Sequence, residues 1–368
     1  MPFSNLQTEQ SYNQGVPDLN PDAAIGSRET LVPIARSQSS QVANAVNQLA
    51  ASQQQAVQWL NQGYEHYQVG QYEAALEVLK QSYAIYLQLE DAEGQGKVLS
   101  YMGLTVYSLK HYSKAIEYAQ AALVFADQAG DRWSAVKILS TLGNAYRHLK
   151  DANRAIECQL QSLTLAREVG DRSGEMAALN NLGLAYKAVG QCEQAIVYEE
   201  QSLEIACQLQ DRQIEEQILK NLGNACYALG NYGKAIAYYE RRLKLAVDLE
   251  DLRLEAQILR HLSNAYYALG DYGRSIQAAE QRLKVSQLLH DLRAEEQALG
   301  SMAIAYDSLG NYAKAIDYYQ QRLAIARHLQ DWRIEEQVLG SLKVAYYALG
   351  DYLKATEYAN QRQNLMRR

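Results

Sequence analysis

The sequence predicts an all-α protein: a right-handed α-solenoid of eight helix-turn-helix repeats behind a disordered N-terminal tail. The first observation is a fixed period of 40 residues, seen where LSTLGNAY (139–146) recurs as LNNLGLAY (179–186) and LKNLGNAC (219–226). A period of about 20–50 residues indicates a repeat array. The second observation is apolar residues at helical spacing in both halves of each unit. The third is that no proline follows Pro33, so nothing interrupts the helices.

The fifth unit shows why each repeat should contain two helices. Apolar residues such as Ile214, Ile218 and Leu222 follow helical spacing and predict a first helix over 212–229. The second helix is expected over about 232–249, with its small and aromatic residues facing inward.

The joints between these helices carry start and stop signals. Gly230 suits the left-handed position that ends a helix, and Asn231 is a typical cap for the next one. A glycine followed by Asp or Asn recurs at 270–271, 310–311 and 350–351. Asp251 is expected to cap the first helix of the following unit, and aspartate recurs at 131, 171, 211, 291 and 331.

Composition and charge exclude several classes of protein. The 368 residues carry a net charge of −7, which disfavours nucleic-acid binding. No apolar run reaches the roughly 18–20 residues that a membrane-spanning helix needs, so no membrane insertion is expected. The N-terminus lacks the basic start and apolar core of a signal peptide, and a cytoplasmic protein is the default expectation.

Nothing in the sequence predicts catalysis, a cofactor or a metal. Its four cysteines form no C-x-x-C pair, and its six histidines never occur four residues apart. No nucleophile-base constellation and no phosphate-binding loop is fixed by spacing. We therefore expect no catalytic residues, no cofactor and no metal site.

Three segments are expected along the chain. Residues 1–37 contain all four prolines and few large apolar groups, and they read as a disordered tail. Residues 38–54 are rich in alanine and glutamine and are expected to form an N-terminal capping helix. Residues 55–368 form the eight-repeat array.

The repeated residues resemble a known family. The pattern LGNAYYALGDY, with its small residue, tyrosine and glycine turn, is similar to tetratricopeptide repeats. The longer unit of 40 residues, with Leu-Gly-Asn segments and Gln-Arg-Leu endings, resembles the forty-residue subfamily. That subfamily includes the Leu-Gly-Asn-repeat polarity adaptors, the G-protein-signalling modulators and rapsyn-like scaffolds. The resemblance implies a superhelix whose first helices line a concave groove.

The resemblance also implies which residues line that groove. The inner positions lie three residues before and one and four residues after the recurring small residue of the first helix. In repeats 3–6 they form what we call the basic strip: Asn144, Arg147, Asn180, Lys187, Lys220, Asn224, Arg260 and Asn264. Tyr227 and Tyr267 add flat amphipathic contacts, and Ile304 and Val344 add apolar surface in repeats 7 and 8. Beside Gly300 and Gly340, these last two residues predict a pocket for a large side chain of the partner.

A second pattern divides the chain into two halves. One position of the second helix reads Ser82, Ala122, Ser162, Ser202 and then the four arginines that we call the arginine ladder: Arg242, Arg282, Arg322 and Arg362. A buried unpaired charge is costly, so each arginine is expected to pair with a Glu or Gln near the start of a neighbouring first helix. Contact with the partner, or duplication of one unit without pairing, remain the alternatives.

These patterns predict a non-catalytic protein-protein interaction module, an adaptor or assembly factor that binds a peptide or helix in its groove. The basic strip predicts that the partner carries an acidic or carboxylate-bearing segment. A monomer is favoured over a homodimer. The alternatives are a self-associating scaffold and a regulator that senses a peptide or metabolite.

Overall fold

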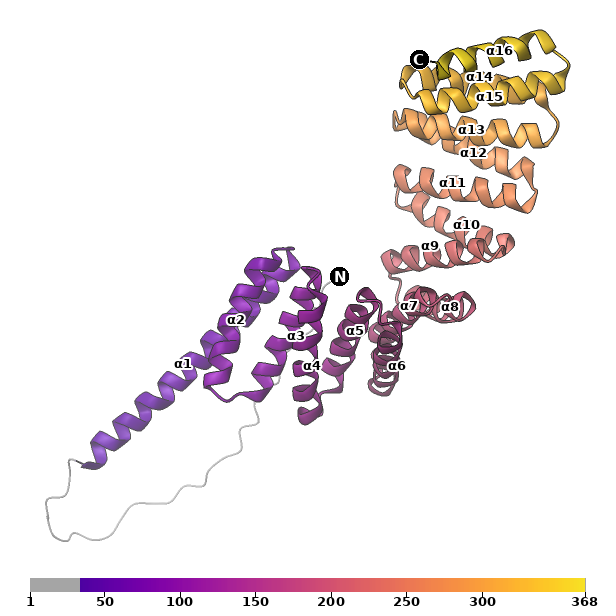
Figure 1. The fold of residues 1–368 in the computed structure, drawn as a ribbon. Coiled ribbons are helices and arrows are strands. Elements are labelled where there is room, and N and C mark those ends of the chain that lie inside the picture. Colours follow the sequence, from indigo (N-terminus) through magenta and orange to yellow (C-terminus); the bar gives the residue numbers. More distant parts are fainter. Residues whose placement is uncertain (1–33, 368) are drawn as a thin grey trace, which may run out of the picture. The chain divides into compact units, whose positions relative to one another are not determined.

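The computed structural model describes the backbone of residues 34–367 and the side chains of residues 46–367. Sixteen helices and no strands occur in that part of the chain (Figure 1). In order they are α1 (Ile34–Gln68), α2 (Tyr72–Gln88), α3 (Ala92–Ser108), α4 (Tyr112–Ala129), α5 (Arg132–His148), α6 (Ala152–Val169), α7 (Arg172–Ala188), α8 (Cys192–Gln208), α9 (Arg212–Ala228), α10 (Tyr232–Asp248), α11 (Leu252–Leu269), α12 (Tyr272–Leu288), α13 (Leu292–Ser308), α14 (Tyr312–His328), α15 (Trp332–Leu349) and α16 (Tyr352–Met366). The predicted all-α fold of eight helix pairs is confirmed, and the helices of the fifth unit match their predicted bounds to within one residue.

The chain divides into two compact units, residues 1–52 and 53–368. Most of the predicted disordered tail, residues 1–33, lies outside the described residues. Residues 34–37 and the predicted capping helix, 38–54, belong to α1, which runs without a break into the first repeat. The helix continues because no glycine or proline occurs between residues 34 and 62.

The joints between helices recur every 20 residues, from residue 70 to residue 350, and each has one residue in the left-handed region. Glycine occupies about half of these positions, Gly230 and Gly270 among them. The others hold larger residues such as Gln210 and Glu250, with φ of 56° and 55°. The sequence identified the glycine joints but not the larger left-handed residues, because only glycine marks such a position by itself.

The predicted caps are confirmed. Asn231 accepts a hydrogen bond from the backbone N–H of Lys234, and Asp251 accepts one from that of Leu254. These side chains satisfy backbone donors that the first turn of a helix leaves unpaired. Each unit therefore starts and stops its helices with its own residues.

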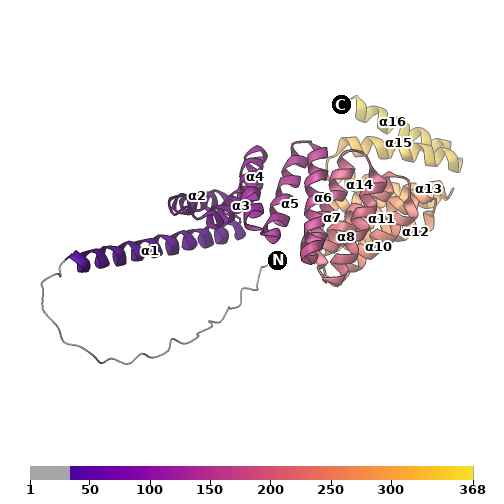
Figure 2. The same cartoon turned by 90° about the horizontal axis from the view of Figure 1, so that it is seen from below.

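The core of the array lies between consecutive helices. Every helix from α2 to α16 packs against its neighbours in the chain, as both views show (Figures 1 and 2). First helices also contact the first helix of the next unit, in the pairs α3 and α5, α5 and α7, and α11 and α13. The buried residues are mainly Ala, Leu and Ile, which suits close helix packing.

Among the described residues, no helix has both the length and the apolar character needed to cross a bilayer.

Candidate partner-binding face

The predicted groove residues all lie on first helices and all keep some exposure to solvent. Asn144 and Arg147 are on α5, Asn180 and Lys187 on α7, Lys220, Asn224 and Tyr227 on α9, Arg260, Asn264 and Tyr267 on α11, Ile304 on α13 and Val344 on α15. Asn144, Arg147, Asn180 and Asn224 are half-buried, and the other residues are exposed. On α9 and α11 the three positions follow spacings of four and three residues, which places them on one side of each helix.

Three members of the set form side-chain hydrogen bonds inside the protein. Nη2 of Arg147 lies 3.3 Å from Nε2 of His148, the next residue of α5. The hydroxyl of Tyr239, a buried residue of α10, donates a hydrogen bond of 2.8 Å to Oδ1 of Asn224. The hydroxyls of Tyr267 and Ser308 lie 3.0 Å apart and link repeats 6 and 7. Asn224 therefore has a structural role, and only the rest of its amide remains for a partner.

The cations of the strip form no ion pair with a carboxylate in the described part of the chain. None of Lys187, Lys220 and Arg260 has a carboxylate within ion-pair distance in the described part of the chain. Other surface arginines do form such pairs, as Arg241 does with Glu215 at 2.5 Å. The strip is thus a local excess of positive charge on an acidic protein.

The pKa of His261, on α11, reflects this excess of positive charge. Its pKa is lowered to about 4, first by burial and then by Arg260, Arg242, Lys220 and Arg282. Every charged group acting on this imidazole is a cation, so protonating it would add a further positive charge to the same place. Sequence reasoning considered the histidines only as metal ligands and missed this role.

The arginine ladder forms side-chain pairs with first helices, as predicted. Arg242, which is 1% exposed, donates through Nε to Oε1 of Glu216 at 2.7 Å. Arg322 bonds Glu296 and Arg362 bonds Glu336 in the same way, both at 2.6 Å. In these three units the partner precedes the arginine by 26 residues and belongs to the first helix of the same unit. We call residues 216, 256, 296 and 336 the acidic column.

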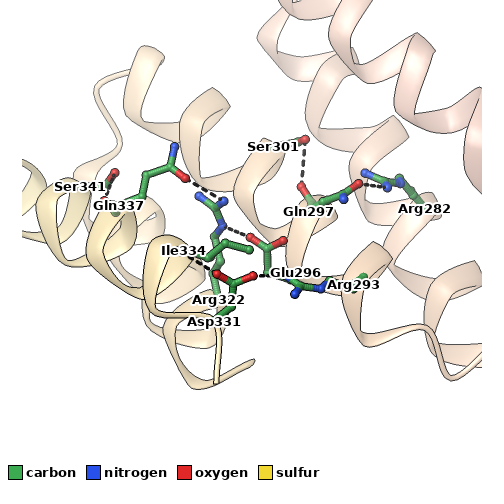
Figure 3. A network of polar contacts seen from close by, with 10 residues as sticks. All are labelled: Arg282, Arg293, Glu296, Gln297, Ser301, Arg322, Asp331, Ile334, Gln337 and Ser341. Carbon is green, nitrogen blue, oxygen red and sulfur yellow. Dashed lines mark hydrogen bonds and ion pairs between the residues drawn. The ribbon is translucent and has the colours of Figure 1, made fainter. Parts of the chain in front are cut away.

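Arg282 departs from this pattern because the acidic column holds Ala256 in the sixth unit. Its guanidinium instead donates through Nη2 to Oε1 of Gln297, on α13 of the next unit, at 2.7 Å (Figure 3). Arg282 is 5% exposed, and its Nε has no hydrogen-bond partner. Burial and the charge of Arg260 lower the pKa of Arg282 to about 10.

In repeats 1, 3 and 4, serine hydroxyls make the corresponding contact between the second and the first helix. The hydroxyls of Ser82, Ser162 and Ser202 donate to the backbone carbonyls of Ala56, Val136 and Met176, again 26 residues earlier. The hydroxyl and the guanidinium thus reach the same position of the first helix. The serine bonds its backbone oxygen, and the arginine bonds its side chain.

The sequence predicts an open pocket beside both Gly300 and Gly340. The structure has a cavity beside Gly340, whereas an arginine fills the space beside Gly300. A Cβ added at Gly300 would lie 3.0 Å from Cζ of Arg322, so the guanidinium already fills this space. At Gly340 the corresponding distance, to Arg362, is 3.5 Å. A cavity of about 360 Å³ remains there, lined by Gly340, Val344 and Tyr319 among others. Room for a partner side chain is therefore present in repeat 8, whereas an arginine fills it in repeat 7.

A buried carboxylate lies in repeat 4. Glu199 of α8 is 1% exposed, and neither of its carboxylate oxygens has a hydrogen-bond partner. Burial raises its pKa to about 7, although the charge of Lys187 acts in the opposite direction. Gln159, at the same position of repeat 3, donates to the backbone oxygen of Ser140 at 3.0 Å. A carboxylate cannot make that bond unless it is protonated.

The described residues contain no group of three or more His, Cys, Asp or Glu side chains that could hold a metal ion. All four cysteines are free thiols, and burial raises the pKa of Cys158 to about 11.

Comparison with known proteins identifies the repeat. The family model for the tetratricopeptide repeat matches residues 134–208, 215–288 and 255–328, which together are more than half of the chain. No curated protein shows significant sequence similarity to the chain. The subfamily suggested by the 40-residue period is not distinguished by this match.

Solved structures agree with the fold. One is a signal transduction ATPase with numerous domains from Pyrococcus horikoshii, which carries a tetratricopeptide repeat sensor. It is 19% identical, with a TM-score of 0.56, and the match covers 86% of this chain and 50% of that protein. The present chain therefore spans half the length of that relative. Another is the apo form of RapI, 16% identical with a TM-score of 0.53, where 75% of this chain and 98% of RapI are covered.

Proposed function

Because the chain belongs to the tetratricopeptide repeat family, we propose that it is a non-catalytic adaptor that binds an acidic segment of a protein partner along its first helices. Repeats of this family typically form protein-interaction modules. The binding face runs over repeats 3–6 and includes the basic strip with Tyr227 and Tyr267. Ile304 and Val344 extend it with apolar surface, and the cavity beside Gly340 accepts a side chain of the partner.

The observation that supports this function best is the unneutralised charge of repeats 5 and 6. Lys220 and Arg260 extend from adjacent units without forming an ion pair within the described residues. Burial first, and then these two cations with Arg242 and Arg282, lower the pKa of the nearby His261 to about 4. A partner's carboxylates would neutralise this charge through charge-assisted hydrogen bonds. Electrostatic complementarity of this kind favours one class of partner and raises the association rate.

The mechanism is presentation rather than catalysis. Short joints and capped helices fix each first helix before a partner arrives, so binding orders few groups of the receptor. Asn144, Asn180 and Asn264 present amides that can hold a peptide backbone, and the lysines and arginines supply charge. Several modest contacts along the strip then add up.

The test is a double charge reversal, Lys220→Glu with Arg260→Glu, assayed on an array of immobilised short peptides of graded net charge. The wild-type chain should retain acidic peptides and the variant should lose them, while the helical circular dichroism of both stays the same. Equal retention by the two proteins would overturn the proposal.

A matched control comes from the second helices of the same repeats. Lys244 and Lys284 are both exposed, and their reversal to Glu changes the net charge by the same amount. This control should keep the acidic peptides. If it loses them equally, the effect comes from net charge and not from the strip.

Self-association and ligand sensing are the competing functions. A self-associating scaffold would show a mass above 41.3 kDa by light scattering that decreases on dilution. A sensor would change its small-angle scattering from compact to extended on adding its ligand. The adaptor function predicts neither change when an acidic peptide is added to the dilute protein.

A further inference from the structure

The sixth repeat keeps its ladder arginine but lacks the carboxylate that this arginine meets in the repeats around it. Glu216, Glu296 and Glu336 each neutralise the guanidinium of the ladder arginine in their own unit, whereas position 256 holds an alanine that reaches no polar group. A buried charge without a counter-charge is unfavourable, so some group is expected to compensate it.

The nearest groups of the protein do not compensate Arg282. Within the described residues, its guanidinium donates one hydrogen bond, to the neutral amide of Gln297, and its Nε has no partner. Asp291 and Glu296 are the acids that act on this guanidinium. Both are already occupied, because Glu296 pairs with Arg322 and Asp291 caps α13 at the N–H of Ala294. Figure 3 shows Glu296 directed to Arg322, away from Arg282.

A second cation, Arg260, increases the excess of positive charge around Arg282. Arg260 lies four residues after Ala256, on the same side of α11, and its charge disfavours the charged form of Arg282. In repeats 7 and 8 this position holds Gly300 and Gly340, which add no charge. Repeat 6 therefore presents two guanidinium groups where its neighbours on the C-terminal side present one guanidinium and one carboxylate.

We infer that repeat 6 is a carboxylate-binding site, in which an acidic side chain of the protein partner lies between Arg260 and Arg282 and takes the place of the missing glutamate. Nε of Arg282 is buried and has no hydrogen-bond partner, and it is the atom that the glutamates bond in repeats 5, 7 and 8. The exposed Arg260 contacts the same carboxylate from the solvent side. Planar guanidinium groups suit carboxylates because their N–H groups can form paired, charge-assisted bonds.

This inference rests on the proposed function and names the point at which the partner is anchored. It also separates Arg282 from the other ladder arginines. Those three are neutralised within the chain and serve the fold, whereas Arg282 is completed by the partner. Because a buried anchor contributes more to binding than an exposed rim charge, one acidic residue of the partner should dominate its affinity.

The test restores the missing carboxylate within the chain. In Ala256→Glu, the new side chain should bond Arg282 as Glu216 bonds Arg242. The isosteric Ala256→Gln is the control, since it has the same size without the charge. Ala256→Glu should melt a few degrees above Ala256→Gln, because it neutralises a buried cation.

The same two variants are then titrated with an acidic peptide selected by the wild-type chain on the array. Binding to Ala256→Glu should be weaker by about ten- to a hundredfold, the effect of losing a charge-assisted hydrogen-bonded anchor. Ala256→Gln should lose less affinity. The nuclear magnetic resonance titration of His261 gives a separate readout, because a carboxylate between the arginines should raise the pKa of this imidazole in the wild-type complex and in free Ala256→Glu.

The outcomes distinguish this site from the broader function. If the selected peptide binds both variants equally, the carboxylate site in repeat 6 is wrong, although the acidic-partner function stands. If the wild-type chain selects no acidic peptide, the proposed function and the anchor both fail. If inorganic phosphate alone raises the pKa of His261 as much as the peptide does, the site takes small anions, and the assignment to a partner's side chain is overturned.

Discussion

Repeats 1–4 and repeats 5–8 use different polar contacts at the same position between the two helices of a unit. At one position of the second helix, Ser162 bonds the backbone oxygen of Val136, whereas Arg242 bonds the side chain of Glu216. Both bonds join residues 26 apart, so the backbone geometry of the two halves is alike at this point. The difference shows that a repeat can exchange a small polar contact for a buried ion pair without changing its helices.

The largest effect is expected from breaking an ion pair of the second half. Arg242→Ala leaves Glu216 without its counter-charge and opens a cavity, and the loss should be about 3–5 kcal/mol of unfolding free energy. Thermal and urea unfolding followed by circular dichroism measure it. Arg241→Ala is the control, because this exposed neighbour pairs with Glu215 at the surface and should cost at most about 1 kcal/mol. Equal losses in the two variants would contradict a structural ladder.

The first half should respond most strongly at Glu199. Its pKa is raised to about 7 by burial, so the folded state binds a proton more tightly than the unfolded chain does. This stabilising contribution is complete below the unfolded pKa near 4.5 and is lost as the pH rises through about 7. Glu199→Gln should therefore be close to neutral at pH 4.5 and stabilising above pH 7, by about 3 kcal/mol at most.

The measurement for Glu199 is the melting temperature of the two proteins as a function of pH. Gln159, the natural glutamine at this position of repeat 3, indicates that the substituted side chain fits. A difference between Glu199→Gln and the wild-type chain that does not change with pH would show that the carboxylate is ionised throughout.

A smaller effect is expected at the serine contact of the first half. Ser162→Ala removes the hydrogen bond to the carbonyl of Val136, and this should cost about 1 kcal/mol. Urea unfolding measures the change. A loss as large as that of Arg242→Ala would mean that the two halves do not differ in the way described here.

The smallest changes in stability are expected at two glycines of the second half, Gly300 and Gly340. Gly340→Ala should stabilise the protein by up to about 1 kcal/mol, because alanine favours the helix and its Cβ would meet Arg362 at an ordinary distance. Gly300→Ala should gain less or become destabilising, since its Cβ would lie 3.0 Å from Cζ of Arg322. Melting temperatures that rank Gly300→Ala above Gly340→Ala would contradict this account.

Much of the fold could be predicted because the helix caps and glycine joints recur at fixed positions of the 40-residue unit. The caps at Asn231 and Asp251 and the glycine joint at Gly230 follow from the residue types and their spacing. The larger left-handed residues, such as Gln210, could not be recognised, since their conformation is imposed by the next helix packing back onto the last. The continuity of α1 was missed for a related reason, because a domain boundary need not break a helix.

The candidate site could be predicted only in part. The pairing of ladder arginines with glutamates followed from the cost of a buried charge, and the structure identified the partner as the residue 26 positions earlier. Ala256 was visible in the sequence, but its meaning depends on Arg282 being buried with Nε unpaired. The space at Gly300 was interpreted as a pocket because the reach of Arg322 could not be seen in the sequence. The raised pKa of Glu199 likewise depends on burial.

Each ladder arginine requires a carboxylate, and among the four arginine repeats only repeat 6 lacks one. A double-mutant cycle that combines Ala256→Glu with Arg282→Gln measures this requirement. Ala256→Glu should stabilise the chain only while Arg282 is present, with a coupling free energy of at least about 1 kcal/mol. If Ala256→Glu changes stability equally in both backgrounds, so that the coupling energy is zero, Arg282 does not require a carboxylate.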